Sequence, residues 1–181
     1  MDTFSNQPGS SHLYILPQNP ALDVRNDLVF FSIFFAVIFS LALTAILKTK
    51  IFGLALAEYV KPIWYFVFIS VGVVIWQYLV GVNLDGNSLQ LRISQWIWEL
   101  AVLASAYKLS KIPKFSYHNM FFLGVLYSLF IHGLKVSIRY FFYAKTLLYV
   151  LDRFLYGSLL VMLIAAGLGS MLILLRNRKL K

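Results

Sequence analysis

The feature that most constrains this chain is a run of twenty residues, from Leu28 to Leu47, that contains no charged side chain. An α-helix needs about 20 predominantly apolar residues to cross ~30 Å of hydrocarbon. A second uncharged run extends from Phe154 to Leu175. Two such runs in a chain of 181 residues indicate an integral membrane protein.

The composition agrees with this interpretation. Hydrophobic residues make up 60% of the chain, charged residues make up 13%, and the mean hydropathy is +0.77. An ordinary soluble domain carries roughly 25% charged residues. The sequence therefore predicts an all-α integral membrane protein, built as a bundle of about five transmembrane helices with short connections and possible interfacial helices.

Five transmembrane spans are expected, at residues 28–47, 63–82, 93–107, 117–134 and 154–175. The second span follows Pro62 and carries tryptophan and tyrosine near both ends, as complete crossings often do. The third span is the weakest, because it provides only fifteen residues and contains Glu99.

Two connecting segments leave alternatives open. Residues 48–61 fit either a short amphipathic helix along the membrane interface or an ordinary loop. Residues 136–153 are aromatic and apolar but contain Arg139, Lys145 and Asp152. They are interpreted as an extension of the fourth helix followed by an interfacial segment, with a sixth short span as the alternative.

The basic residues predict the topology. The formal charge of +9 comes from residues that flank the apolar runs and form no continuous basic tract, so nucleic-acid binding is not expected. With five spans, ten Lys and Arg residues fall on one side and six on the other. The positive-inside rule then places the polar tail of residues 1–27 outside and the basic tail of residues 176–181 in the cytoplasm. We expect the membrane to be the cytoplasmic membrane of a bacterium or archaeon.

Glu99 is the first candidate functional residue, because an ionisable group within a span is costly and usually faces protein, a cavity or a partner charge. It is a candidate for binding a proton or cation. The alternative is a structural, hydrogen-bonded carboxyl. The expected topology also brings Glu99 and His132 to similar depth, so a contact between them is a further hypothesis.

His118 and His132 lie fourteen residues apart in the fourth span. This spacing resembles that of b-type cytochromes, in which paired histidines on two helices hold two haems. The resemblance covers one helix only, and the third histidine, His12, lies in the tail. Binding of haem b through His118 and His132 would therefore need a second copy, a partner subunit or ligation by a single histidine.

Two other patterns involve helical faces. His132, Lys135 and Arg139 form a basic stripe, because spacings of three and four place them on one face. The stripe fits an anionic headgroup or substrate, or it extends to lipid phosphates in the ordinary way. The fifth span carries small residues that allow close helix packing, namely Gly157, Ala165, Ala166, Gly169 and Ser170.

These features favour a non-catalytic subunit or assembly factor of a larger membrane complex. A small oligomeric channel that conducts protons or ions through Glu99 is the first alternative, and a haem-binding electron-transfer subunit is the second. No catalytic or metal-binding residues are predicted, and a non-enzymatic role is favoured. The expected partners are the lipid bilayer and either other membrane proteins or further copies of this chain.

Overall fold

The computed structural model describes residues 20–179 except 82, 83, 86 and 144, and the segments 1–19, with His12, and 180–181 lie outside the described residues. The helices are α1 (Pro20–Ile46), α2 (Leu56–Val60), α3 (Trp64–Leu79), α4 (Leu89–Ser110), α5 (Tyr117–Tyr127), α6 (Leu134–Tyr143), α7 (Leu147–Met162) and α8 (Gly169–Lys179). The shorter elements are the 3-10 turn η1 (Lys61–Ile63), the π-helical turns η3 (Ser128–Gly133) and η4 (Leu163–Leu168), and the strands β1 (Lys50–Ile51) and β2 (Leu54–Ala55). The predicted all-α class is confirmed.

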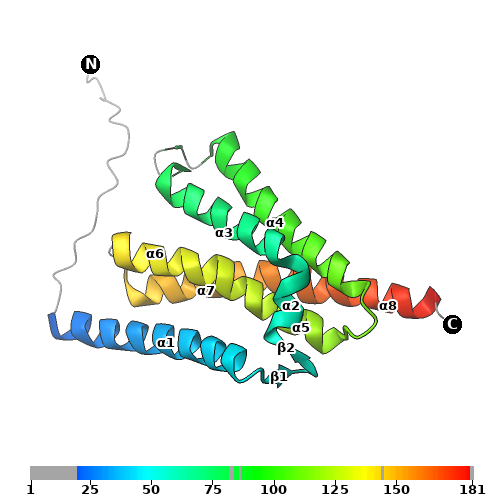
Figure 1. Ribbon diagram of the computed structural model, residues 1–181. Coiled ribbons are helices and arrows are strands. Elements are labelled where there is room, and N and C mark those ends of the chain that lie inside the picture. The colour runs from blue at the N-terminus through cyan, green and yellow to red at the C-terminus, as the bar shows by residue number, and fades with distance from the viewer. Residues whose placement is uncertain (1–19, 82–83, 86, 144, 180–181) are drawn as a thin grey trace, which may run out of the picture.

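Five long helical segments run back and forth between two ends of the structure, namely α1, α2–α3, α4, α5–η3–α6 and α7–η4–α8 (Figure 1). The β1–β2 hairpin, the α4–α5 connection and the end of α8 lie at one end, here named the hairpin end. The start of α1 and the α3–α4 and α6–α7 connections lie at the other end, here named the open end. The first helix therefore begins at the end opposite to the one where the last helix finishes.

Four of these five segments are long and apolar enough to cross a membrane, namely Val24–Ile46, Leu56–Leu79, Tyr117–Tyr143 and Leu147–Arg178. The exception is α4, although its 22 residues exceed the fifteen expected from sequence. This helix is long enough to cross a membrane but is too polar, because it contains the charged residues Arg92, Glu99 and Lys108. The count of segments with the required hydropathy is thus four where the sequence predicted five spans.

The two halves of α4 differ in how far other helices cover them. This helix packs against α3, α5, α8 and η4, so other helices cover much of its surface. Trp98, Val102, Ala106 and Leu109 are each at most 2% exposed. The first half of α4 is less covered, and Trp96 there is 59% exposed, so α4 is enclosed only in part.

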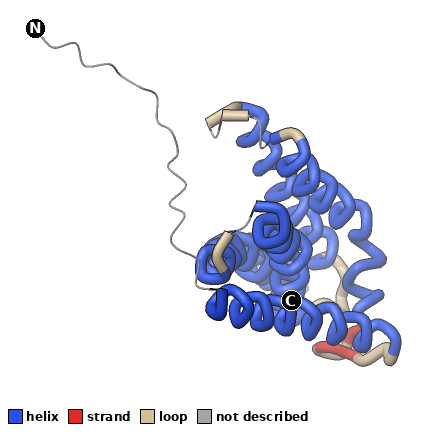
Figure 2. The backbone as a smooth tube through the Cα atoms, turned by 90° about the vertical axis from the view of Figure 1, so that its left-hand side faces the viewer, coloured by secondary structure: helices blue, strands red, loops and turns tan. Residues whose placement is uncertain are grey.

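The opposite case is α1, which lies at one edge of the structure (Figures 1 and 2). Among its described side chains only Phe30 is buried. The Phe30 ring stacks on Tyr140 of α6 with the centroids 3.9 Å apart, and Asp27 accepts a hydrogen bond from the Tyr140 hydroxyl. This aromatic contact anchors α1 near the open end.

The segment 48–61 forms a β-hairpin followed by α2 and the first residue of η1. Phe52 and Gly53 both have positive φ, at 49° and 85°, as a two-residue type I′ turn requires. Tyr59 of α2 donates a hydrogen bond of 2.8 Å to a carbonyl of β1 and accepts one of 2.5 Å from Asn119 of α5. The hairpin, at one edge of the structure in Figure 2, is thereby tied to the helices.

The segment 136–153 forms neither a separate helix nor a sixth span. The fourth helix continues as predicted, through α6 to Tyr143. The next helix begins at Leu147, where the Thr146 side chain caps it by accepting a hydrogen bond from the amide of Tyr149. The fifth helical segment therefore begins at Leu147, before the predicted start of the fifth span at Phe154, and Lys145 and Thr146 are the described residues that lie between the two helices.

Candidate functional site: a basic pocket at the open end

A cavity of about 310 Å³ lies between α4, the η3–α6 helix and α7, in the half of these helices nearer the open end. Its lining residues are Gln95 and Trp98 from α4, His132, Lys135, Val136 and Arg139 from η3 and α6, and Arg153, Tyr156, Gly157 and Leu160 from α7. On both η3–α6 and α7 the lining positions follow the spacing i, i+3, i+4, i+7 of a single helical face. We name this cavity the basic pocket.

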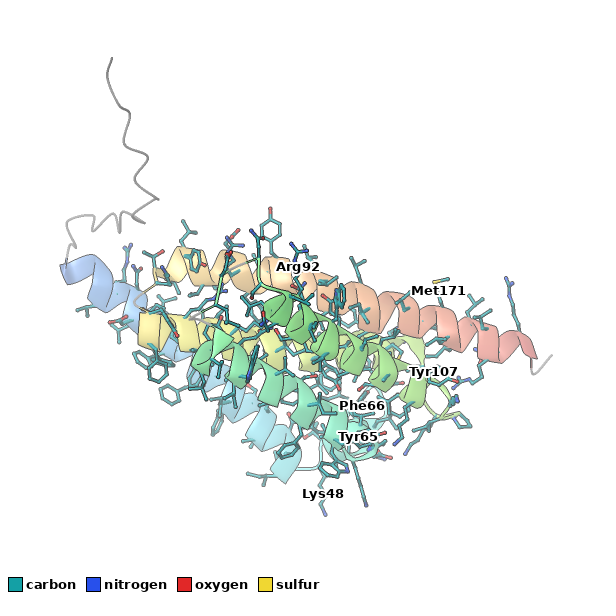
Figure 3. The ribbon with its side chains drawn as sticks, turned by 90° about the horizontal axis from the view of Figure 1, so that it is seen from above. Lys48, Tyr65, Phe66, Arg92, Tyr107 and Met171 are labelled. Carbon is teal, nitrogen blue, oxygen red and sulfur yellow. The ribbon has the colours of Figure 1, made fainter. Side chains whose placement is uncertain are left out.

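The arrangement of α4 and α7 explains why a cavity forms here. α7 packs on η3 and α6, whereas α4 packs on η4 and α8 farther along the same long helix. Toward the open end α4 diverges from α7 (Figure 1). Arg92 and Tyr107 mark the two ends of α4 in Figure 3, and the basic pocket lies on the Arg92 side. The pocket therefore has η3–α6 as its floor and α4 and α7 as its walls.

His132 sits at the bottom of the pocket and is only 8% exposed. Its ring meets Trp98 edge to face, with the centroids 5.5 Å apart and the planes at 90°. On its other side lies Gly157, where a Cβ atom would overlap the imidazole ring. The absence of a side chain at Gly157 thus leaves room for His132.

Two buried nitrogen atoms in the pocket have no hydrogen-bond partner among the described residues. They are Nε2 of His132 and Nε1 of Trp98. The indole nitrogen is a donor only, and a buried donor without a partner costs about 1–3 kcal/mol. Because neither atom is accessible to solvent, a ligand in the pocket would reach them only after the side chains around them shift.

Three cations surround the pocket, and aromatic rings hold them in place. The ammonium of Lys135 lies 4.9 Å from the Trp98 ring centroid. The guanidinium groups of Arg139 and Arg153 lie 5.8 Å and 5.4 Å from the Tyr149 ring centroid, and Arg139 also donates a hydrogen bond of 3.4 Å to the Tyr149 hydroxyl. Cation–π contacts orient a positive charge but do not neutralise it.

No carboxylate forms an ion pair with these cations within the described part of the chain, and Glu99 acts on Lys135 only at longer range. The only ion pair there joins Lys114 to Glu58, at the hairpin end. Lys135, Arg139 and Arg153 therefore present a net positive charge to the pocket, which the nearby charge of Glu99 offsets only in part. An anion is the ligand that this electrostatic arrangement favours.

Glu99 lies beside the pocket and does not meet His132. Its carboxylate accepts a hydrogen bond of 2.9 Å from the amide of Gln95, one turn earlier on α4. His132 packs instead on Trp98. Among the described interactions, the hypothesised contact between Glu99 and His132 does not form.

The two candidate haem ligands lie against different elements. His118 is exposed at the start of α5, with its ring 5.5 Å from that of Phe52 in the hairpin. His132 is buried in the basic pocket. No other histidine is present among the described residues, so a second histidine ligand for either one would have to come from outside that part of the chain.

The small residues of the fifth span pack against the fourth helix within the same chain. A Cβ atom at Gly169 would lie 3.0 Å from the sulfur of Met120, and one at Gly124 would lie 3.5 Å from Ala165. Ala166 and Ser170 are half-buried. Close approach of α5–η3 to α7–η4–α8 thus depends on this face.

Sequence reasoning missed most of the pocket walls. Gln95, Trp98, Arg153, Tyr156 and Leu160 were not singled out, although a signal for the α7 face was present. Thr146 is a residue type that often caps a helix. A helix that begins after Thr146 includes both Arg153 and Gly157, which then lie on one face because they are four residues apart. The alignment of three separate faces at one depth is a tertiary property that no local pattern reveals.

Comparison of the chain with models of protein families, with curated proteins and with solved structures finds no match.

Proposed function

We propose that this chain is a membrane protein with five crossings that binds an anionic group in the basic pocket. The four apolar segments and α4 would form the crossings, with the N-terminus outside and the C-terminus cytoplasmic. The proposal assigns a binding role, and it includes no catalytic step.

Charge placement supports the five crossings. The hairpin end carries Lys48, Lys50, Lys61, Lys108, Lys111, Lys114, Arg176 and Arg178 among the described residues. Under the positive-inside rule this end faces the cytoplasm. The basic pocket then opens in the outer half of the membrane. The positive-inside rule does not account for cations on that side, so they need another explanation.

The observation that carries the proposal is the set of three cations that line one cavity, none of which forms an ion pair among the described residues. A structural ion pair would have provided a carboxylate, and cations extending to lipid phosphates would not converge on one cavity. Lys135, Arg139 and Arg153 converge from two helices on the same cavity. Convergence of this kind is typical of anion recognition, in which guanidinium groups bind oxygens in pairs.

Equilibrium binding of inorganic phosphate to the full chain in neutral detergent tests the proposal, with chloride at equal ionic strength as the reference. The double variant Lys135→Gln, Arg139→Gln is expected to weaken phosphate binding roughly tenfold or more, since each hydrogen bond to a charged group contributes about 1.5–3 kcal/mol. Equal binding by wild type and this variant would overturn the proposal.

A matched control removes the same charge from the same end of the structure. Arg92 at the start of α4 (Figure 3) and Lys145 before α7 do not line the pocket. The double variant Arg92→Gln, Lys145→Gln is expected to bind phosphate as the wild type does. A loss in this control as large as in the pocket variant would show that only the general charge of that end matters.

A second proposal is that the chain is a non-catalytic subunit or assembly factor of a membrane complex, with α1 as the contact helix. Its support is the exposure of α1, on which Phe31, Phe35 and Phe39 are 38%, 60% and 67% exposed. Photo-crosslinking from Phe35 in native membranes tests this proposal. Crosslinks to a protein support it, and crosslinks to lipid alone contradict it.

A further inference from the structure

We infer that the anion in the basic pocket is the phosphate headgroup of a membrane amphiphile, which enters sideways between α4 and α7 and leaves its hydrocarbon chain outside the pocket. This inference rests on the proposed anion-binding function and adds the class of ligand and its route. The argument has three steps, namely charge, size and the nature of the opening.

The charge of the pocket matches a phosphate monoester. Lys135, Arg139 and Arg153 provide three positive charges, and Glu99, bound to Gln95 beside the pocket, provides one negative charge. The difference leaves about two positive charges for the ligand to balance. A phosphate monoester carries about −1.5 to −2 near pH 7, whereas a carboxylate or a phosphate diester carries only −1.

The donors of the pocket also match a group with several oxygens. A phosphate monoester has three terminal acceptor oxygens, which can receive two guanidinium groups and an ammonium at once. Trp98 and His132 also line this cavity, but their unpartnered ring nitrogens are buried and are not accessible from it, so the three cations are the donors that a ligand meets. A planar carboxylate offers two oxygens and would leave donors unsatisfied.

The size of the pocket limits what it encloses. Its volume of about 310 Å³ is at the lower limit for small-molecule sites, which are usually about 300–1,000 Å³. A headgroup fits this space, and a complete lipid does not. The remainder of an amphiphile must therefore lie outside the polar part of the cavity.

The opening of the pocket provides an apolar path for that remainder. Leu160 and Tyr156 line the α7 side of the pocket and are 37% and 69% exposed. One turn beyond Leu160 on the same face lies Leu163, which is 68% exposed. A hydrocarbon chain that follows this face stays in apolar surroundings while its headgroup reaches the cations. A freely soluble anion would gain nothing from such a path.

The experiment uses the full chain reconstituted in phosphatidylcholine vesicles that contain phosphatidic acid, a phosphate monoester, or phosphatidylglycerol, a phosphate diester, as a minor component. Native mass spectrometry after mild extraction measures the lipid retained. The wild type is expected to retain phosphatidic acid at least several-fold better than phosphatidylglycerol. Lys135→Gln, Arg139→Gln should reduce that retention roughly tenfold, whereas Arg92→Gln, Lys145→Gln should leave it unchanged.

A third variant separates lateral entry from anion binding. Leu163→Trp crowds the apolar path outside the pocket lining and removes no charge, so it is expected to reduce phosphatidic acid retention several-fold and to leave inorganic phosphate binding unchanged. Thermal unfolding of each variant verifies that the protein remains folded. If Leu163→Trp is unfolded, Leu163→Gln places a polar side chain on the apolar path instead and is expected to preserve inorganic phosphate binding while reducing lipid retention.

The outcomes distinguish the inference from the function on which it rests. If inorganic phosphate binds in a manner that depends on Lys135 and Arg139, but phosphatidic acid is retained no better than phosphatidylcholine, the inference is wrong and anion binding stands. If neither probe responds to the pocket variant, both are wrong. Equal retention of phosphatidic acid and phosphatidylglycerol would contradict the assignment to a monoester.

Discussion

The imidazole ring of His132 occupies the space that Gly157 leaves on α7, so closely that a Cβ atom at Gly157 would overlap three atoms of the ring. The imidazole ring has little room to move away from Gly157, because Trp98 of α4 packs against it. This contact couples the packing of two helices to the shape of the basic pocket. It makes Gly157 a position where a single methyl group should affect both stability and binding.

Gly157→Ala is expected to reduce the free energy of unfolding by about 1–3 kcal/mol, the usual cost of inserting a methyl group into a filled interior. The displaced imidazole should also weaken binding of inorganic phosphate. Thermal unfolding in detergent and the phosphate assay measure the two effects. Gly167→Ala is the matched control, because a Cβ atom at Gly167 meets nothing within 4 Å. It should be neutral or slightly stabilising, since alanine favours helix.

Asn119 of α5 joins the hairpin to the helices. Its Oδ1 accepts hydrogen bonds from the amide and hydroxyl of Ser116, and its Nδ2 donates to the Phe52 carbonyl at 3.1 Å and to the Tyr59 hydroxyl at 2.5 Å. Asn119→Asp retains the shape but replaces the donor with an acceptor that faces two oxygens. We expect a loss of about 2–4 kcal/mol in the free energy of unfolding.

Tyr59→Phe serves as the comparison for that prediction. It removes only the hydroxyl that links Asn119 to β1, so its cost should be smaller, about 1–2 kcal/mol. Proteolysis within the hairpin should accelerate in both variants, and more in Asn119→Asp. Wild-type protease resistance in Asn119→Asp would contradict the proposed role of this amide.

Arg176 in α8 closes the connection between α4 and α5. Its guanidinium donates hydrogen bonds of 2.7, 2.8 and 3.2 Å to the carbonyls of Ser110, Ile112 and Phe115. Arg176→Lys retains the charge but loses the fork that reaches all three carbonyls, so we expect the free energy of unfolding to fall by about 1–3 kcal/mol. The exposed Arg178 provides the control. Arg178→Lys should unfold at the wild-type temperature, and equal effects at both positions would refute the specific role of Arg176.

The long helices could be predicted where hydropathy alone defines them. The uncharged runs of α1 and of the α7–α8 segment marked their interiors, because no soluble element requires so many consecutive apolar residues. Their ends were predicted less well. Arg153 was treated as the boundary of the fifth span, although the helix continues back to Leu147. A charged side chain ends an apolar run but does not end a helix.

The site was predictable only in part, for a related reason. The stripe formed by His132, Lys135 and Arg139 is a local pattern on one helix, and the structure places all three in the pocket. The contribution of Trp98 depends on how α4 crosses the other helices, and no spacing within α4 specifies that crossing. The π-helical turn that carries His132 also leaves no mark in the hydropathy pattern, because it adds one residue per turn without changing polarity.

Ser105 of α4 and Tyr127 of α5 form a buried hydrogen bond of 2.6 Å, and the serine hydroxyl donates in turn to the Ala101 carbonyl at 2.8 Å. The Tyr127 hydroxyl is therefore the donor in the first bond. A double-mutant cycle with Ser105→Ala and Tyr127→Phe is expected to give a coupling energy of about 0.5–2 kcal/mol. Both single variants should be destabilised and the double variant by less than their sum, as measured by unfolding in detergent. Strict additivity would show that α4 and α5 are held together by packing of apolar side chains alone.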